Sequence, residues 1–254
     1  MEEFAAYAHY YDLLYRDKDY RAEANFVLEA LARAGRRPRS LLELGCGSGR
    51  HAFAMAAAGV EVWAVDRSES MLALARQRAP ALPVDCPQPR FLPGDAGKLR
   101  LERSFDAATA LFHVMSYQTS EDEAMAVFDG VGRHLERGGL FFFDFWHGPG
   151  VLRDPPGERV KVMEDDSMRV ERTARPAHRV RDNLVEVRYS LRVHDKIEGG
   201  DECLEETHRL RYWFLPELRR LAECTGLAVA GCGAWMTGEP PGPDAWYAWM
   251  ALRA

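Results

Sequence analysis

The apolar positions of this chain follow two different patterns. Between residues 40 and 146, short apolar runs alternate with stretches in which apolar residues recur every three or four positions. Short buried runs predict parallel strands, and the longer spacing predicts helices that cover the sheet. We expect strands over 40–44, 62–66, 90–96, 104–113 and 136–144, and helices over 19–34, 51–58, 120–135 and from Ser68 onward. Residues 2–15 form an aromatic-rich segment that is either helical or a cap.

The pattern changes after Asp144. Four segments there alternate apolar and polar residues, which is typical of half-buried antiparallel strands. They cover residues 159–163, 168–173, 184–193 and 207–214. A helix over 216–224 and two last strands, 227–235 and 245–252, follow. A parallel sheet does not need the four alternating strands, so we interpret them as an insertion.

A glycine loop is the most informative local motif. Gly45, Gly47 and Gly49 follow the first predicted strand, and without a Cβ they let the backbone turn sharply and approach a ligand. Asp66 ends the next strand, where an acid accepts hydrogen bonds from ribose hydroxyls. A dinucleotide site would need its third glycine at position 50, which is the bulky Arg50. The pattern therefore indicates a nucleoside site of another kind.

The G-x-G-x-G spacing, with Glu43 just before it, resembles motif I of the class I S-adenosylmethionine-dependent methyltransferases. The similarity continues over residues 40 to 145, although Arg137 stands where that family usually has proline. The resemblance implies an α/β fold: a seven-stranded, mostly parallel, Rossmann-like sheet with helices on both faces and an inserted antiparallel β meander. It also implies S-adenosylmethionine as cofactor. The expected cofactor contacts in this part are Glu43, Gly45, Cys46, Gly47, Gly49, Asp66, Arg67, Met71, Asp95 (toward the adenine amino group), Ala96, Leu111 and Phe112.

The fold implied by this resemblance sets the domain organisation. Residues 1–152 are expected to form an N-terminal cap and the cofactor-binding core, and residues 153–214 the inserted meander. Residues 215–254 supply a helix and a β hairpin that complete the core sheet. The meander can contact the substrate, and it can also supply the surface of a homodimer.

Two N-terminal motifs narrow the resemblance. A-x-x-Y-D ends in Tyr11 and Asp12, and D-Y-x-x-E contains Tyr20 and Arg21. Together with Phe145–Trp146 they are similar to the small N-methyltransferases that act on amino sugars, and in part to glycine N-methyltransferases. The resemblance implies that Tyr11 lies over the cofactor near its methyl group, with Tyr20 and Arg21 near its amino-acid end. Alternatively, these aromatic residues only fix the N-terminal helix to the sheet.

Candidates for catalysis follow the fourth predicted strand. Open α/β sheets bind ligands beyond the carboxyl ends of their strands, and His113 and Tyr117 lie there. Either can act as a general base or hydrogen-bond the substrate, and Tyr11 is the third catalytic candidate. The amino-sugar enzymes tend to carry a histidine nearer the position of Tyr117, so the identity of the base is not carried over. His113 can equally be satisfied by backbone groups at the strand end.

Substrate contacts are expected from two segments. Trp146 and His147 end the fifth strand, where an aromatic face can stack on a sugar and an imidazole can donate to it. The alternative is a turn whose tryptophan packs under the meander. Arg175 and Arg179 belong to a basic segment of the meander that can hold phosphates, although a solvated hairpin face explains it at least as well.

Composition excludes several classes of function. The net charge of −6 argues against a general nucleic-acid binder, and no apolar run is long enough for a membrane span. The five cysteines are scattered, which predicts reduced thiols in a cytoplasmic protein. No set of His, Cys, Asp or Glu has the spacing of a metal site.

The sequence therefore predicts a methyltransferase of a small molecule, with N-methylation of an amino sugar, on a nucleotide carrier or free, as the main hypothesis. An O- or N-methyltransferase of another small metabolite or natural product is the alternative. A non-catalytic S-adenosylmethionine-binding subunit and a nicotinamide oxidoreductase are the hypotheses from other classes.

Overall fold

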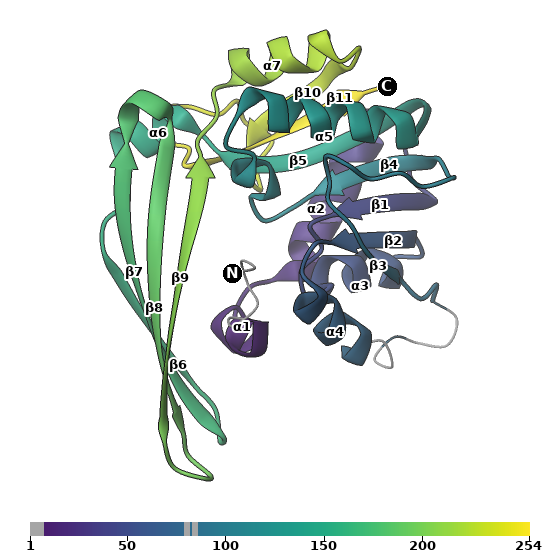
Figure 1. Cartoon of the computed structure of the whole chain (residues 1–254). Helices are drawn as coiled ribbons and strands as arrows, with labels where there is room; N and C mark the ends of the chain where they lie inside the picture. Colours follow the sequence, from purple (N-terminus) through teal and green to yellow (C-terminus); the bar gives the residue numbers. More distant parts are fainter. Residues whose placement is uncertain (1–7, 79–81, 83–85) are drawn as a thin grey trace.

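A computed structural model describes residues 8–78, 82 and 86–254. Residues 2–7 of the aromatic-rich N-terminal segment lie outside this part. The first half of the chain alternates helices and strands (Figure 1). Its elements are α1 (Ala8–Leu14), α2 (Tyr20–Arg33), β1 (Ser40–Leu44), α3 (Arg50–Ala57), β2 (Glu61–Asp66), α4 (Glu69–Arg78), β3 (Arg90–Pro93), β4 (Phe105–Ala110), η2 (Val114–Tyr117), α5 (Glu121–His134) and β5 (Leu135–Trp146).

The second half forms the insertion and then returns to the first sheet. Its elements are α6 (Gly148–Arg153), β6 (Arg159–Glu164), β7 (Met168–Arg179), η3 (Val180–Asp182), β8 (Leu184–Asp195), β9 (Asp201–Arg211), α7 (Leu215–Cys224), β10 (Ala228–Ala234) and β11 (Tyr247–Arg253). Among the described residues, no helix is long and apolar enough to cross a membrane.

The seven strands of the main sheet run in the order β10-β11-β5-β4-β1-β2-β3. The neighbours from β5 to β3 pair in parallel, whereas β11 pairs antiparallel with both β5 and β10. This order brings the carboxyl ends of β1, β2 and β4 together at one edge of the sheet. The predicted fold class is confirmed.

Helices cover both faces of this sheet (Figure 1). One apolar cluster joins Phe128 of α5 and Leu218 of α7 to buried strand residues such as Phe141. A second cluster joins Val27 of α2 and Met55 of α3 to the opposite face. Each helix buries a stripe of apolar residues three or four positions apart, so the periodicity in the sequence becomes the packing of the layers.

The start of α5 shows how local sequence sets an element. Ser120 Oγ accepts a hydrogen bond from the Glu123 amide at 3.2 Å, and Glu123 Oε2 accepts one from the Ser120 amide at 3.1 Å. This reciprocal capping satisfies two helix-end donors. The capping box predicted from the sequence is confirmed.

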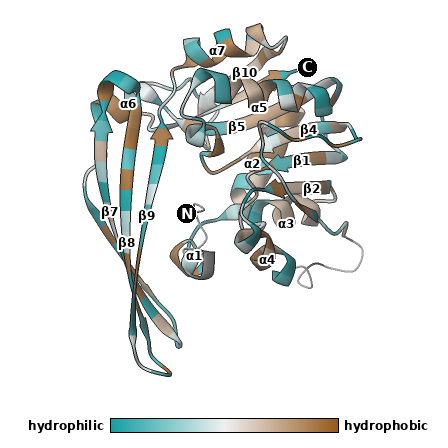
Figure 2. Ribbon diagram, in the orientation of Figure 1, coloured by the Kyte–Doolittle hydropathy of each residue, from teal (hydrophilic) through white to brown (hydrophobic). Residues whose placement is uncertain are grey.

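The insertion is a separate antiparallel sheet of four strands in the order β6-β7-β8-β9. Its strands are long and extend away from the main sheet beside α1 (Figure 1). Apolar and polar residues alternate along β8 (Figure 2). One face of the sheet packs Val170, Leu191 and Val193 against Tyr10 and Leu14 of α1. The meander therefore holds the N-terminal helix in place.

Several strand boundaries differ from the prediction, and two of these differences bear on the candidate site. The strand expected over 207–214 ends at Arg211, because Tyr212 and Trp213 leave the sheet and are completely buried in the core. The Trp213 amide donates to the Trp146 carbonyl at 2.9 Å, which couples the insertion to β5. The strand expected over 168–173 continues to Arg179, so both Arg175 and Arg179 lie on β7.

Candidate active site

The glycine loop connects β1 to α3. Gly45, Gly47 and Gly49 all have a left-handed backbone, with φ of 64°, 53° and 75°. A Cβ on Gly45 would lie 2.5 Å from Cγ2 of Val114, and one on Gly49 would lie 2.8 Å from the ring of Phe91. In the part of the chain that the structure describes, no atom beyond its chain neighbours lies within 4 Å of the Cβ position of Gly47. Two of the glycines therefore permit close packing, and the third leaves the backbone open.

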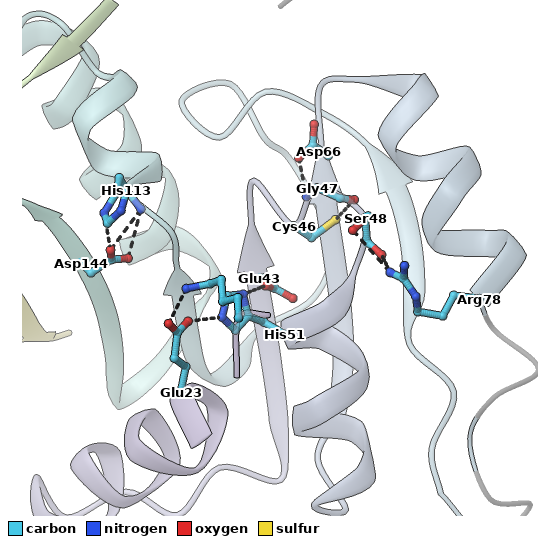
Figure 3. A network of polar contacts seen from close by, with 11 residues as sticks. Glu23, Glu43, Cys46, Gly47, Ser48, His51, Asp66, Arg78, His113 and Asp144 are labelled. Carbon is cyan, nitrogen blue, oxygen red and sulfur yellow. Dashed lines mark hydrogen bonds and ion pairs between the residues drawn. The ribbon is translucent and has the colours of Figure 1, made fainter. Parts of the chain in front are cut away.

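Asp66 ties the loop to the end of β2 (Figure 3). One carboxylate oxygen accepts the Gly47 amide at 2.7 Å, and the other accepts the Ser68 amide at 2.8 Å. A carboxylate oxygen can accept more than one hydrogen bond, so the Asp66 carboxylate is chemically able to accept from a diol as well. This is the local chemistry that a ribose ring requires.

A cavity of about 500 Å³ opens over this loop. It brings together residues from the N-terminal helix, the ends of the main strands and the inserted sheet. The predicted site residues that line it are Tyr11, Tyr20, Gly45, Cys46, Gly47, Asp66, Arg67, Met71, Asp95, Ala96, Leu111, Phe112, His113, Tyr117 and Trp146.

Three predicted cofactor residues do not line the cavity. Arg21 is exposed, because the inward stripe of α2 runs through Tyr20 and Glu23. Gly49 lies behind the loop against Phe91, and Glu43 is buried beneath it. Gly49 and Glu43 therefore support the loop from behind, whereas Arg21 faces solvent.

Three predicted substrate residues are also placed elsewhere. His147 is buried with its Nδ1 2.9 Å from the Ala245 carbonyl, and burial lowers the pKa of its imidazole. Arg175 pairs with Glu158 and Arg179 pairs with Glu186, and both arginine side chains are exposed. The structure does not bring these arginines to the cavity, since they lie on the solvent-facing side of β7.

A buried polar cluster supports the loop from below (Figure 3). His51 Nε2 lies 2.8 Å from Glu23 Oε2, and its Nδ1 lies 3.9 Å from Glu43 Oε1. Although burial opposes it, hydrogen bonding and charge from His51 and Lys18 lower the pKa of Glu23. Glu43 Oε2 has no hydrogen-bond partner among the described residues, and burial and then the nearby Asp66 raise the pKa of this carboxyl to about 8.

The chain turns sharply after β4, at two strained residues. Phe112 and His113 both have a left-handed backbone, with φ of 62° and 67°, which non-glycine residues rarely adopt. The buried Asp144 carboxylate accepts the His113 amide at 3.1 Å, and it lies 2.6 Å from His113 Nδ1 (Figure 3). The His113 ring also stacks on Tyr247 at 4.6 Å. Asp144 thus holds both the strained backbone and the imidazole at the cavity wall.

Aromatic rings form the wall nearest the N-terminal helix. The rings of Tyr11 and Tyr15 lie 4.7 Å apart, and Tyr15 meets Phe112 edge-on at 5.1 Å. Lys18 Nζ lies 4.4 Å above the Phe112 ring. Electron-rich ring faces attract cations, so this wall suits a positively charged sulfonium group.

An ionic clasp fixes α1 over the cavity. Asp12 accepts a hydrogen bond from Ser48 Oγ at 2.9 Å and from Arg50 Nε at 3.2 Å. Arg78 Nη2 also pairs with the Asp12 carboxylate. Tyr11 precedes Asp12, so the clasp also positions the predicted catalytic tyrosine.

Several cavity residues were missed by sequence reasoning. They are Tyr15, Ser48, Arg50, His51, Gly94, Gly97, Lys98, Val114, Gln118, Glu123, Ala126, Tyr189, His208 and Leu210. Arg50 and Ser48 stand inside the glycine motif and could have been found from it. Tyr189 and His208 carry no local signal, because alternation along a strand shows which residues share a face but not what that face covers.

Comparisons with known proteins agree with this geometry. A family model described as a methyltransferase domain matches residues 41–139. The dTDP-3-amino-3,4,6-trideoxy-alpha-D-glucopyranose N,N-dimethyltransferase of Streptomyces venezuelae is 28% identical over 93% of this chain and 94% of its own length. Fold, loop and cavity together define a class I methyltransferase.

Solved structures extend the likeness over nearly the whole chain. The CcbJ methyltransferase of Streptomyces caelestis superposes with a TM-score of 0.73 at 28% identity, covering 93% of this chain and 95% of the other. An S-adenosylmethionine-dependent methyltransferase of Clostridium acetobutylicum has a TM-score of 0.81 at 24% identity, covering 99% of each chain. The chain is therefore an S-adenosylmethionine-dependent methyltransferase that resembles the amino-sugar N-methyltransferases.

The described residues fit this cofactor. Gly47 offers an open backbone, Asp66 a carboxylate at the end of β2, and Asp95 a second carboxylate, ordered by a 2.9 Å hydrogen bond from the Gly97 amide. Between them lies the cavity, with Tyr11 and Phe112 on its wall. We propose that Asp66 holds the ribose, that Asp95 holds the adenine, and that Tyr11 and Phe112 border the sulfonium.

Proposed function

We propose that this enzyme methylates the amino group of an amino sugar or a similarly small amine. The observation that carries the proposal is a single cavity that joins the cofactor loop to an aromatic end with protonatable side chains. That end is lined by Tyr117, Trp146, Tyr189, His208 and Leu210. Aromatic faces stack on sugar rings, and the tyrosine and histidine can hydrogen-bond or accept a proton.

The relatives support the acceptor class. The Streptomyces venezuelae relative acts, by its name, on an amino sugar attached to dTDP. Among the described lining residues, the arginines and lysines are Arg50, Arg67 and Lys98, and they follow the cofactor-side strands and loop. The aromatic end therefore suits the sugar ring better than a diphosphate.

The residues of the chain have three tasks in this reaction. S-adenosylmethionine, when bound, supplies the activated methyl group. Tyr11 and Phe112 border the place where the sulfonium is expected, and Asp66 would orient the cofactor through its ribose. Holding donor and acceptor in line can supply several kcal/mol of the barrier. An ammonium acceptor must also lose a proton before it can attack, so a base is required at the aromatic end.

A paired acceptor screen tests this proposal. The enzyme is incubated with S-adenosylmethionine and matched pairs of sugars that differ only in an amino or hydroxyl group, each free and dTDP-linked, and products are followed by mass spectrometry. We expect methylation of the amino member of a pair. Methylation of the hydroxyl member alone would favour an O-methyltransferase, and cofactor binding without any product would favour a non-catalytic subunit.

The homodimer through the meander and the cytoplasmic location stay predictions.

A further inference from the structure

We propose that Tyr117, His208 and Glu206 form a proton relay that removes the proton from the acceptor amine. Tyr117 Oη lies 2.8 Å from His208 Nδ1, and His208 Nε2 lies 3.0 Å from Glu206 Oε2. Tyr117 and His208 both line the cavity. This inference rests on the proposed amine acceptor, and it assigns a role to two residues of the inserted sheet.

The three residues come from two separate parts of the fold. Tyr117 ends η2, at the carboxyl edge of the main sheet, and His208 and Glu206 lie on β9. The His208 side chain is 2% exposed and that of Glu206 is 7% exposed. A buried histidine with a carboxylate on one nitrogen and a phenol on the other is held in one orientation.

The hydrogen-bonding partners of His208 fix which of its ring nitrogens carries the hydrogen when the imidazole is neutral. An ionised carboxylate can only accept hydrogen bonds, so His208 Nε2 must carry the hydrogen that faces Glu206. His208 Nδ1 is then a bare lone pair that accepts the Tyr117 hydroxyl hydrogen. A phenol oxygen can accept a hydrogen bond as well as donate one, so Tyr117 can accept a hydrogen from a group in the cavity while it donates to His208.

The chemistry of the relay balances as two coupled proton transfers. The acceptor ammonium gives one N–H proton to Tyr117 Oη as the phenol passes its own proton to His208 Nδ1. The nitrogen becomes a neutral amine with a free electron pair, and His208 becomes an imidazolium held against Glu206. One proton leaves by this route for each methyl group transferred, and water takes it from the imidazolium afterwards.

The surroundings of Tyr117 keep its phenol neutral. The residue therefore passes a proton on and does not persist as a phenolate. Burial, followed by the neighbouring Tyr189 and Tyr15, raises the pKa of Tyr117 well above its usual range. The charge of Arg67 opposes this shift, and that of Glu206 adds to it. Tyr189 of β8 also meets the His208 ring edge-on at 5.0 Å.

Two further groups complete this environment. Arg172 of β7 lies 5.0 Å from the Tyr189 ring and donates to Tyr15 Oη at 2.9 Å. Its charge therefore faces the two phenols that neighbour the relay. His113, which also lines the cavity, is held by Asp144 on a different strand, so it belongs to a separate polar unit.

His208→Asn is the sharpest variant. Its amide oxygen can still accept the Tyr117 hydroxyl hydrogen but cannot take up a proton. We expect kcat at pH 7 to fall about 10²-fold with little change in KM or in cofactor affinity. The loss should shrink as pH rises, because at high pH the acceptor amine is already deprotonated in solution. Tyr117→Phe should show the same pH-dependent loss.

His194→Asn is the matched control. His194 lies in the same sheet and also pairs with a carboxylate, Asp201, at 2.9 Å, but it is 52% exposed and does not line the cavity. We expect it to retain the wild-type pH profile. If His208→Asn and Tyr117→Phe bind the cofactor normally and keep the wild-type kcat and pH profile, the relay is refuted.

A second measurement needs no acceptor and separates this inference from the proposed function. Nitrogen-15 NMR of histidine-labelled enzyme reports which ring nitrogen of His208 carries hydrogen, with His208→Asn used to assign the signal. Hydrogen on Nε2 with a bare Nδ1 supports the relay, and the opposite tautomer overturns it. If the enzyme methylates hydroxyl acceptors and no amine, the proposed function fails and the relay has no ammonium to deprotonate, whereas the opposite tautomer in an enzyme that methylates amines overturns the relay alone.

Discussion

Replacing Glu43 with glutamine should make the protein more stable, and increasingly so as pH rises. Glu43 lies on β1 directly before the glycine loop and is 1% exposed. Its Oε2 is buried and has no hydrogen-bond partner among the described residues. Burial and the neighbouring Asp66 raise the pKa of this carboxyl from 4.5 to about 8. Glutamine has nearly the same shape as the neutral carboxyl but cannot ionise.

The free energy of unfolding depends on pH because the Glu43 carboxyl binds its proton more tightly in the folded protein than in the unfolded chain. Between pH 4.5 and 8 the folded protein keeps the Glu43 proton while the unfolded chain releases it. The stability linked to this group is therefore fully present below pH 4.5 and is lost as pH rises toward 8. At 1.36 kcal/mol per pKa unit, this separation corresponds to about 5 kcal/mol at most. We expect the advantage of Glu43→Gln over wild type to grow by about 3 kcal/mol between pH 5 and pH 8.

Urea denaturation of both proteins at each pH unit measures this difference. Any cost of burying the amide is independent of pH, so the slope is the informative quantity. Glu61→Gln on the neighbouring strand β2 is a control of opposite sign, because the hydrogen bonds from Arg103 lower the pKa of Glu61. It should lose at most about 1 kcal/mol at neutral pH, and this loss should vanish in acid. A difference between Glu43→Gln and wild type that stays constant with pH would refute the reasoning.

Three further variants probe the loop and the cavity. Asp66→Ala should weaken binding of S-adenosylmethionine by about 2 to 4 kcal/mol, roughly 30- to 1000-fold in Kd by calorimetry, since it removes a charged acceptor; unchanged affinity would take Asp66 out of the site. Gly45→Ala should lower stability by about 2 kcal/mol or more in urea titration, because its Cβ would overlap Val114 at a left-handed φ; a wild-type midpoint would contradict this. His113→Ala should lower kcat about 10²-fold while cofactor affinity changes little, because the imidazole lines the cavity beside Phe112 and its loss would let the acceptor shift out of line; equal turnover would leave His113 as only a partner of Asp144.

Much of the main sheet could be predicted because its signals are local. The buried strands of a parallel sheet are continuous apolar runs. The loop between β1 and α3 is recognisable from three glycines in five residues. Asp66 is predictable from its distance along the chain from the glycine loop, since one βαβ unit has a nearly fixed length. The order of strands followed from the resemblance.

The parts that could not be predicted depend on contacts between distant segments. Arg175 and Arg179 were grouped by their nearness in sequence, yet β7 continues through them and turns their side chains to solvent. His208 faces the cavity because β9 passes close to η2. Its partner Tyr117 lies 91 residues away along the chain, and no local pattern encodes a contact over that distance. Trp213 left the predicted strand because the core beside β5 buries its ring completely.

Calorimetric titration of the wild-type protein with S-adenosylmethionine, S-adenosylhomocysteine and NAD tests the central claim most directly. The cavity over the glycine loop, with Asp66 and Asp95 at its wall and Arg50 beside it, should bind the two adenosyl ligands and reject the dinucleotide. We expect saturable binding of S-adenosylmethionine and S-adenosylhomocysteine that Asp66→Ala weakens, and no heat from NAD. Binding of NAD, or of no adenosyl ligand, would contradict the assignment of this cavity as a methyltransferase site.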